Sequence, residues 1–171
     1  MIRLLSGKRA GNTRSVLRLA NREVYSVIGS ILDNANEPNL VIWGSGFMYE
    51  NGVFRAKPKR VCAVRGPLTR AKIIEQGVDC PEVFGDPALL LPLFYRPRRD
   101  VPRARLGIVP HYVDKQNPFL RTLALVEEVK LIDIESSISN VIDEICSCDF
   151  IASSSLHGLI VADAYGIPSV C

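Results

Sequence analysis

The 171-residue sequence predicts an α/β protein made of two Rossmann-like halves, each built on a parallel sheet. Short apolar runs rich in β-branched residues alternate with helical patterns, which is the order expected of parallel strands joined by crossover helices. Glycine or proline follows most of these runs, as is typical of strand ends. A segment rich in proline and arginine interrupts the alternation once. We therefore expect an N-terminal half at 1–92, a linker at 93–105 and a C-terminal half at 106–171.

The first half is expected to begin atypically and then to alternate regularly. Residues 2–5 can form a strand and residues 16–20 a short helix, on either side of a turn-rich stretch. Pro67 at a first helical position and Gly77 after the last apolar residue mark the start and the end of a helix. An apolar exit follows at 88–93. Apolar runs predict strands at 25–32, 39–43, 61–64 and 83–84.

The second half repeats the alternation after the linker. Asn117 and Pro118 open one helix, and Ser137 or Ser139 caps the next. Gly166 ends the last helix. Strands are expected at 106–109, 129–134 and 150–152, and helices at 118–128, 138–146 and 156–165.

The last helix carries an apolar stripe that we expect to be buried. Its members follow the spacing i, i+3, i+4, i+8 and are Leu156, Leu159, Ile160 and Ala164. A further strand is expected after Gly166, and the sequence stops at Cys171 within it. Because a buried parallel strand needs elements on both faces, we expect the second half to be incomplete. The chain is then a fragment, a truncated homologue or a chain completed by a partner.

The composition is that of a globular protein without a strong charge bias. Hydrophobic residues make up 47% of the chain and the net charge is +3, which does not support binding to nucleic acid. No apolar run approaches the roughly 20 residues of a membrane helix, and no signal-peptide core is recognisable. The five cysteines are scattered and form no CxxC pair. We therefore expect a cytoplasmic protein with reduced thiols, no metal site and no cofactor.

Three basic or histidine residues follow expected strands, namely Arg65, His111 and His157. Open α/β sheets bind ligands beyond the carboxyl ends of their strands, and a helix that starts there favours an anion. The run of Ser153, Ser154 and Ser155 stands at such a helix start, where it can hold a phosphate or simply cap the helix. A hydrogen-bonded structural role stays open for all of these residues.

Two further strand-end turns hold weaker candidates. Gly44, Ser45 and Gly46 form a flexible turn that lacks the full GxGxxG framework, so substrate binding there is only one alternative. Asp86 is either a general acid or base or a turn-forming residue before proline. Asp114 and Asp163 are expected to be solvated or to cap helices. No HExxH or GxSxG motif is present.

Several of these stretches together resemble the polysaccharide pyruvyl transferase family, in order and in spacing. They are VIWGSGF (41–47), VCAVRGPLTRAKI (61–73), FGDPALLLP (84–92), LGIVPHYVD (106–114) and SSSLHGLIVADAYGIPSV (153–170). The resemblance implies a fold similar to two-domain GT-B glycosyltransferases, with the active site in the cleft between the halves. It also implies a reaction: phosphoenolpyruvate gives its enolpyruvyl unit to two sugar hydroxyls, forming a pyruvate ketal and releasing phosphate.

The resemblance also implies roles for particular residues. His157, within the family's Leu-His motif, would contact the phosphate or act as an acid, and Arg65 would bind the donor. His111 would face the cleft from the second half, towards the acceptor sugar. Some family members have an arginine where this chain has Ser155, and the family's N-terminal glycine-rich acidic loop is not recognisable here.

We therefore predict His157, His111 and Asp86 as catalytic residues, without deciding which is the acid and which the base. The predicted substrate-binding residues are Arg65, Ser153, Ser154, Ser155, Leu156, Gly158, Gly44, Ser45 and Gly46. No metal or cofactor is expected beyond the donor substrate, phosphoenolpyruvate.

Two other functions stay open, and so does the cellular setting. One is a GT-B nucleotide-sugar glycosyltransferase, in which Asp163 would hold the ribose; the other is a truncated, non-catalytic saccharide-binding homologue. The expected partners are phosphoenolpyruvate and a saccharide acceptor of exopolysaccharide synthesis, lipid-linked or not. The arginines between Arg96 and Arg105 form either a solvated hinge or a peripheral contact with the inner face of the membrane. The oligomeric state is not predicted.

Overall fold

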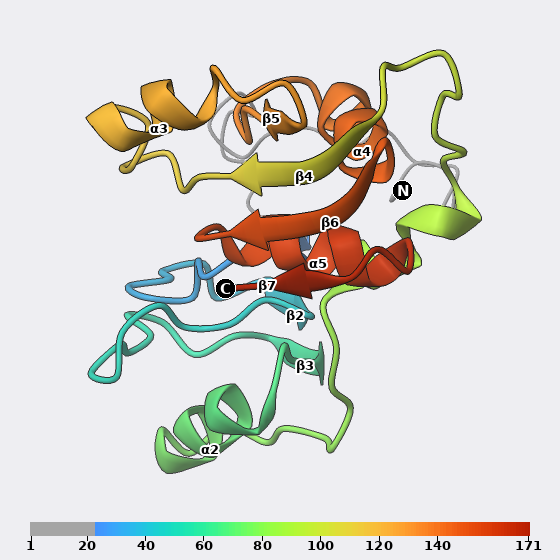
Figure 1. Ribbon diagram of the computed structural model, residues 1–171. Helices are drawn as coiled ribbons and strands as arrows, with labels where there is room; N and C mark the ends of the chain where they lie inside the picture. Colours follow the sequence, from blue (N-terminus) through green and yellow to red (C-terminus); the bar gives the residue numbers. More distant parts are fainter. Residues whose placement is uncertain (1–22) are drawn as a thin grey trace. The chain divides into compact units, whose positions relative to one another are not determined.

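The computed structural model describes residues 23–171 and shows a mixed α/β protein with two parallel sheets (Figure 1). This confirms the predicted fold class of two Rossmann-like halves. The expected strand at 2–5 and helix at 16–20 lie outside the described residues. The chain divides into two compact units, Met1–Pro87 and Ala88–Cys171, so the division falls before the start of the expected linker at 93.

The sheet of the first unit has three parallel strands in sequence order. They are β1 (Val24–Ser26), β2 (Leu40–Trp43) and β3 (Arg60–Ala63). The strand predicted at 25–32 ends at Ser26, because Gly29 takes a φ of 106° and turns the chain. The strand predicted at 83–84 is reduced to a single bridge between Val64 and Phe84.

The helix of the first unit, α2, forms where its end signals predict it. It spans Pro67–Glu75, starts with proline at the first turn and is followed by Gly77 at a φ of 70°. It buries Thr69 and Ile73, which lie one turn apart on the same face. The core beneath it consists of Leu32, Leu40, Ile42, Phe47, Val61, Val64, Ile73 and Cys80. A 3-10 helix, η1 (Pro87–Leu93), replaces the expected apolar exit.

The sheet of the second unit has four parallel strands, with β4 and β6 in the centre (Figure 1). Its order is β5-β4-β6-β7, from strands β4 (Ala104–Val109), β5 (Val129–Leu131), β6 (Cys148–Ser153) and β7 (Ser169–Val170). Val109 and Ser153, the last residues of the two central strands, lie opposite each other. The loops that follow β4 and β6 therefore leave the same edge of the sheet side by side.

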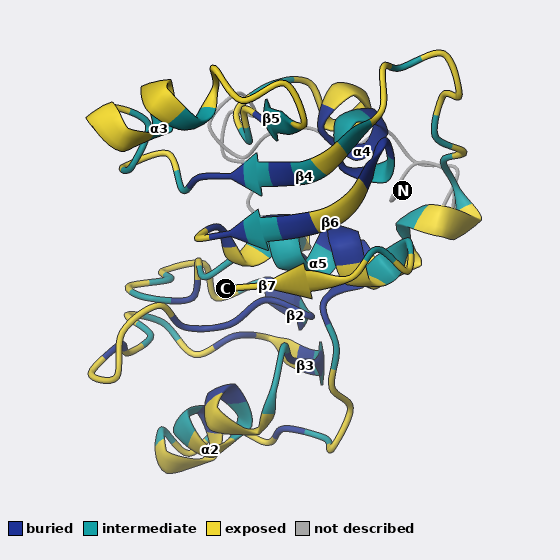
Figure 2. Cartoon of the chain, in the orientation of Figure 1, coloured by how far each residue is buried: buried dark blue, intermediate teal, exposed yellow. Residues whose placement is uncertain are grey.

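Three helices accompany this sheet: α3 (Pro118–Leu123), α4 (Ile138–Cys146) and α5 (Leu156–Ala164). Helix α4 has its predicted bounds and its predicted cap, since Ser137 Oγ accepts a hydrogen bond of 3.3 Å from the Asn140 N–H. It buries Val141, Ile142 and Ile145. Figure 2 shows both buried and exposed residues along this helix. Helix α3 is shorter than predicted, because it buries no residue and so gains no packing energy that would extend it to 128.

The buried face of α5 differs from the predicted one. Leu156 is exposed and Leu159, Ile160 and Ala164 are only partly buried, whereas Gly158, Val161 and Ala162 are buried. Both sets follow the i, i+3, i+4 spacing of a helical face, so the apolar pattern alone does not choose between them. Packing chooses the face with Gly158, because only a residue without Cβ can approach β4 and β6 so closely.

Residues of the expected linker are anchored to the second unit through Asp143 on α4. Asp143 is only 3% exposed, and its carboxylate accepts hydrogen bonds from the Tyr95 hydroxyl (3.0 Å) and the Arg98 N–H (2.9 Å). The Tyr165 hydroxyl donates to the Tyr95 carbonyl oxygen at 2.9 Å. Burial, followed by the bond to Asp143, raises the pKa of Tyr95 above its usual value. The carboxylate is thus a buried charge whose partners come from the linker.

All five cysteines are free thiols in the structure. Burial raises the pKa of the Cys146 thiol to about 11, and burial likewise raises the pKa of Cys148. These two thiols are therefore protonated and poorly nucleophilic at neutral pH, as expected of structural cysteines.

We expect Asp143→Ala to lower the free energy of unfolding by about 1–3 kcal/mol, because it leaves the Tyr95 and Arg98 donors without their acceptor. Asp149→Ala is the matched control, since Asp149 pairs with Arg103 on the surface, where ion pairs contribute little. Urea unfolding of both variants measures the difference. Equal losses of stability in the two variants would contradict a linker anchored at Asp143.

Candidate functional site

The carboxyl edge of the first sheet brings three predicted segments together. The first is the turn after β2, with Gly44 to Gly46, and the second is the loop after β3, with Arg65. The third follows the bridge at Phe84 and contains Asp86. The Arg65 N–H donates to the Ser45 carbonyl oxygen (3.3 Å), and the Gly85 N–H donates to that of Val64 (3.0 Å). Backbone hydrogen bonds therefore hold the three segments in a fixed arrangement.

Close packing explains two residues of the turn after β2. Gly44 has a φ of 98°, and a Cβ built there would lie 2.1 Å from Pro87 Cδ, so only glycine fits. Ser45 is fully buried, and its hydroxyl lies 2.6 Å from the Ser26 hydroxyl. The side chain of Ser45 thus joins β1 to the turn after β2. Asp86, next to Pro87, is only 5% exposed.

The Arg65 guanidinium is half-buried and held in one orientation. Its Nη1 donates to Ser30 Oγ at 2.7 Å and its Nη2 to the Phe47 carbonyl oxygen at 3.1 Å. A Cβ on Gly46 would lie 2.9 Å from Nη2, so this glycine makes room for the guanidinium. Arginine has five N–H donors, and these two contacts leave others that can bind an anion. The sequence does not predict this role of Ser30, because the residue lies in a run that is predicted to be a strand.

At the carboxyl edge of the second sheet, Ser153 and Gly158 build the turn between β6 and α5. The Ser153 hydroxyl lies 2.9 Å from the carbonyl oxygens of Val109 and Ser155 and accepts a 3.1 Å hydrogen bond from the Ser155 N–H. A Cβ on Gly158 would lie 2.3 Å from the Ser153 hydroxyl oxygen. Both predicted residues are therefore packed into the turn, where they shape the start of α5.

Ser154 joins this turn to the loop after β4. Its hydroxyl oxygen accepts a hydrogen bond from the His111 N–H (2.8 Å), and the hydroxyl donates to Asp114 Oδ2 (2.8 Å). Asp114 was expected to be solvated or to cap a helix, so sequence reasoning missed this contact. Its position at the end of the strand-end motif PHYVD is the one feature of the sequence that pointed to it.

His157 lies in the first turn of α5, and its Nε2 is a buried atom. The helix begins after Ser155, whose hydroxyl makes no capping hydrogen bond, and Leu156 beside it is 43% exposed. The first N–H groups of a helix have no partner within the helix, and with the helix dipole they favour an anion. This end of α5 has the chemistry that a phosphate requires, and substrate binding by His157 stays a prediction.

The loop after β4 is also tied to the loop after β5. Lys115 forms ion pairs with Asp133 and Glu135. The hydrogen bond with Lys115 lowers the pKa of Asp133, and its two carboxylate partners raise the pKa of Lys115. Residues 110–117, which carry His111, are thus connected to both neighbouring strand ends.

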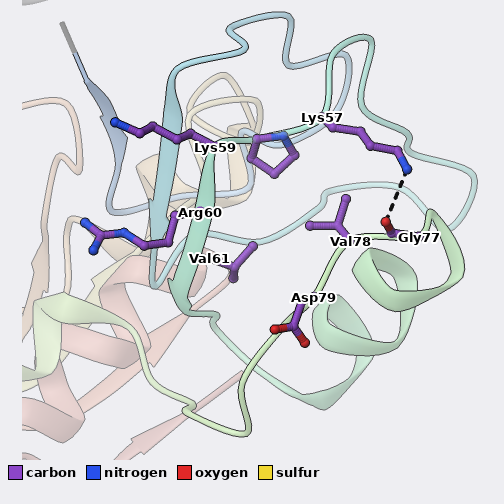
Figure 3. Close-up of a pocket in the computed structure, with 8 residues that line it drawn as sticks. Lys57, Lys59, Arg60, Val61, Gly77, Val78 and Asp79 are labelled. Atoms are coloured by element: carbon purple, nitrogen blue, oxygen red, sulfur yellow. Dashed lines mark hydrogen bonds between the residues drawn. The ribbon is translucent and has the colours of Figure 1, made fainter.

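A pocket of about 320 Å³ lies elsewhere in the first unit (Figure 3). It is lined by Lys57, Pro58, Lys59, Arg60, Val61, Gly77, Val78 and Asp79. These residues stand at the amino end of β3 and beyond the end of α2, where Lys57 Nζ donates to the Gly77 carbonyl oxygen at 3.2 Å. This is the sheet edge opposite to Arg65, and the carbonyl end of a helix disfavours an anion. The pocket is therefore not the predicted donor site.

Within residues 23–171, no group of three or more histidine, cysteine or acidic side chains is placed to hold a metal ion. None of the helices described is long and apolar enough to cross a membrane.

Comparison with known proteins finds one matching family model, described as polysaccharide pyruvyl transferase, over residues 27–171. The chain is 34% identical over 148 residues to the uncharacterized protein L143 of Acanthamoeba polyphaga mimivirus, covering 84% of this chain and 51% of that protein. It is 32% identical over 161 residues to the succinoglycan biosynthesis protein ExoV of Rhizobium meliloti (strain 1021), covering 86% and 49% respectively. The chain thus spans about half the length of these curated relatives. No solved structure matches it significantly.

We expect Gly158→Ala to lower the melting temperature, because a Cβ at this position collides with the Ser153 hydroxyl and with Val109. The loss should correspond to about 1–3 kcal/mol. Gly66→Ala is the control, since its Cβ would meet no atom within 4 Å and its φ of −170° suits any residue. Calorimetry of both variants tests this, and a Gly158→Ala protein as stable as the control would refute the close approach.

Proposed function

Since the chain belongs to the polysaccharide pyruvyl transferase family, we propose that it takes part in transfer of a pyruvyl group from phosphoenolpyruvate to a saccharide. The product is a pyruvate ketal on two sugar hydroxyls, formed during synthesis of an exopolysaccharide. The match over residues 27–171 and the similarity to a succinoglycan biosynthesis protein support this proposal. The structural observation that carries it is the fixed Arg65 guanidinium, which has donors left for an anion.

The donor carries two anionic groups, and the described residues offer matching chemistry. A guanidinium binds a carboxylate through two parallel N–H···O bonds, which suits Arg65. A phosphate suits the first turn of α5 with His157. We propose Arg65 in the first unit and the start of α5 in the second unit, each taken by itself, as candidate binding groups for these anions.

The chemical step balances without an added reductant or oxidant. Protonation of the donor's methylene carbon makes C2 an oxocarbenium-like centre, and a sugar hydroxyl attacks C2 while a base takes its proton. A second hydroxyl then replaces the phosphate at C2, so that the C2–O bond to phosphate breaks and the hydroxyl proton is released. His157 is our candidate for the acid. His111 is our candidate for a residue that contacts the acceptor sugar. Asp86 is only 5% exposed, and its role as acid or base stays a prediction.

The nucleotide-sugar alternative gains no support from the helix that would hold the ribose. Asp163 is exposed and stands near the carbonyl end of α5, whereas His157 lies in its first turn. The two residues are six positions apart, about 9 Å along the helix, and no described contact of Asp163 points to a ribose. We do not propose this function.

We propose that the arginine-rich segment is a solvated connection rather than a membrane contact. Three of its five arginines form ion pairs, Arg98 with Asp100, Arg103 with Asp149 and Arg105 with Glu128. In the described part of the chain this leaves Arg96 and Arg99 without an ion pair. Each basic residue near an anionic membrane contributes about 1 kcal/mol, so two of them bind weakly.

We expect Arg65→Ala and His157→Ala each to weaken phosphoenolpyruvate binding by about tenfold to a hundredfold, because hydrogen bonds to charged groups contribute about 1.5–3 kcal/mol. Thermal-shift titration measures this, since the stabilisation of the folded state grows with the logarithm of the ligand concentration divided by Kd. Arg96→Ala is the matched control. Arg65→Lys keeps the charge and separates loss of the planar fork from loss of folding. Wild-type affinity in both alanine variants would overturn the donor site.

Incubation with phosphoenolpyruvate and a galactose- or glucose-containing acceptor should release inorganic phosphate. The phosphate should appear in a one-to-one ratio with the ketal on the saccharide, detected by mass spectrometry. Stabilisation by UDP but not by phosphoenolpyruvate, with turnover of a nucleotide sugar, would replace the proposed reaction by the alternative.

We expect the protein to stay in the supernatant when it is centrifuged with phosphatidylserine vesicles at physiological salt, because most of its linker arginines are paired. Neutral phosphatidylcholine vesicles are the control. Sedimentation with the anionic vesicles only, reduced by added salt, would instead show a membrane contact of this segment.

A further inference from the structure

The loop between β4 and α3, residues 110–117, is joined to the β6–α5 turn by two hydrogen bonds of Ser154. Asp114 Oδ2 accepts the Ser154 hydroxyl at 2.8 Å, and Ser154 Oγ accepts the His111 N–H at 2.8 Å. Within the loop, the Asp114 N–H donates to the His111 carbonyl oxygen at 2.8 Å. His111, Asp114 and Ser154 therefore form one hydrogen-bonded unit that spans two loops.

The direction of each bond in this unit follows from the number of protons. A backbone N–H can only donate, so the Ser154 oxygen must be the acceptor for His111. The one hydroxyl proton of Ser154 then points to Asp114, which is an acceptor when it is ionised. A hydrogen bond to a carboxylate is stronger than one between neutral groups, so the Ser154 hydroxyl proton stays in its bond to Asp114. The Ser154 hydroxyl is thus occupied within the protein.

The register of β4 and β6 brings the segments that carry the two histidines to the same edge of the sheet. Val109 and Ser153 lie opposite each other, and the two histidines of the chain follow them, His111 after β4 and His157 in the first turn of α5. The Asp114–Ser154 bond joins the loop that carries His111 to the turn that begins α5. A change at Asp114 would therefore move His111 without removing a group from the helix start.

We propose that Asp114 is a positioning residue, which acts through Ser154 to hold His111 at the acceptor side of the pyruvyl transfer site. The inference rests on the proposed function for its kinetic consequence, but the hydrogen-bonded unit itself does not. It assigns a role to Asp114, and it makes Ser154 a link between two loops rather than a phosphate ligand. The lysine next to it, Lys115, secures the other side of the same loop through Asp133 and Glu135.

The first experiment needs no activity and measures amide hydrogen exchange at His111 by NMR. We expect Ser154→Ala and Asp114→Ala to accelerate this exchange about tenfold, since each breaks a link of the unit. Ser154→Thr keeps the hydroxyl and should exchange at nearly the wild-type rate. Asp163→Ala, which removes an exposed carboxylate on α5, is the matched control. An unchanged His111 rate in Ser154→Ala would overturn the proposal.

The second experiment measures steady-state kinetics of phosphate release with a saccharide acceptor. Asp114→Ala and Ser154→Ala should lower kcat about tenfold to a hundredfold and raise the KM for the acceptor, because a small displacement of a reacting group is costly. The KM for phosphoenolpyruvate should stay within about twofold, and Ser154→Thr should restore kcat. An unchanged kcat, or an equal rise of both KM values, would contradict a positioning role for Asp114.

The two measurements separate the possible failures. If the wild-type protein releases no phosphate from phosphoenolpyruvate, the proposed function fails, while the exchange rate of His111 still decides whether the unit exists. If exchange accelerates in the variants and turnover does not change, the unit exists and its catalytic role is refuted.

Discussion

The parallel pairing of β4 with β6 is the constraint on which the second unit depends. Because Val109 lies opposite Ser153, both strands end at the same level, and the chain leaves them in adjacent loops. The Ser153 hydroxyl bonds to the Val109 carbonyl oxygen, and Gly158 allows α5 to begin directly against both strands. A side chain at 158 would force α5 away from the sheet. The position of His157 thus follows from a contact that involves no reactive group.

The first unit uses the same means to fix its own candidate residue. Gly44 packs on Pro87, and Gly46 leaves room for the Arg65 guanidinium, which bonds to Ser30 and to Phe47. A single hydrogen bond contributes only about 1 kcal/mol net, so the number of contacts decides how firmly a side chain is held. Groups that are held before the substrate arrives lose less entropy on binding, which favours both affinity and rate. Each sheet therefore has an ordered carboxyl edge.

Charged side chains at the surface form exposed ion pairs, whereas the buried carboxylate of Asp143 is satisfied by hydrogen bonds. Arg98, Arg103 and Arg105 form ion pairs that are open to water and contribute little. Asp143 is buried on α4, and its hydrogen bonds to the linker offset the cost of removing a carboxylate from water. The same stretch of chain is thus solvated at its arginines and anchored at Tyr95.

The sequence by itself determined the fold class, the family and the bounds of the helices that have clear end residues. Pro67 and Gly77 for α2, Ser137 for α4 and Gly166 for α5 act through local backbone geometry, which a sequence states directly. The rule that ligands bind beyond parallel strands also named Arg65, His111 and His157 as candidates, and their roles stay predictions.

Only the tertiary structure decided which face of α5 is buried and which polar groups meet. The apolar pattern of α5 allows two faces, and the close approach at Gly158 selects one of them. Ser154 and Asp114 are forty positions apart in sequence, so no local pattern predicts their hydrogen bond. The length of α3 likewise depends on packing, because α3 buries no residue. Packing and pairing between remote segments are properties of the folded chain. They hold the residues that follow the strands in fixed positions at the edge of each sheet.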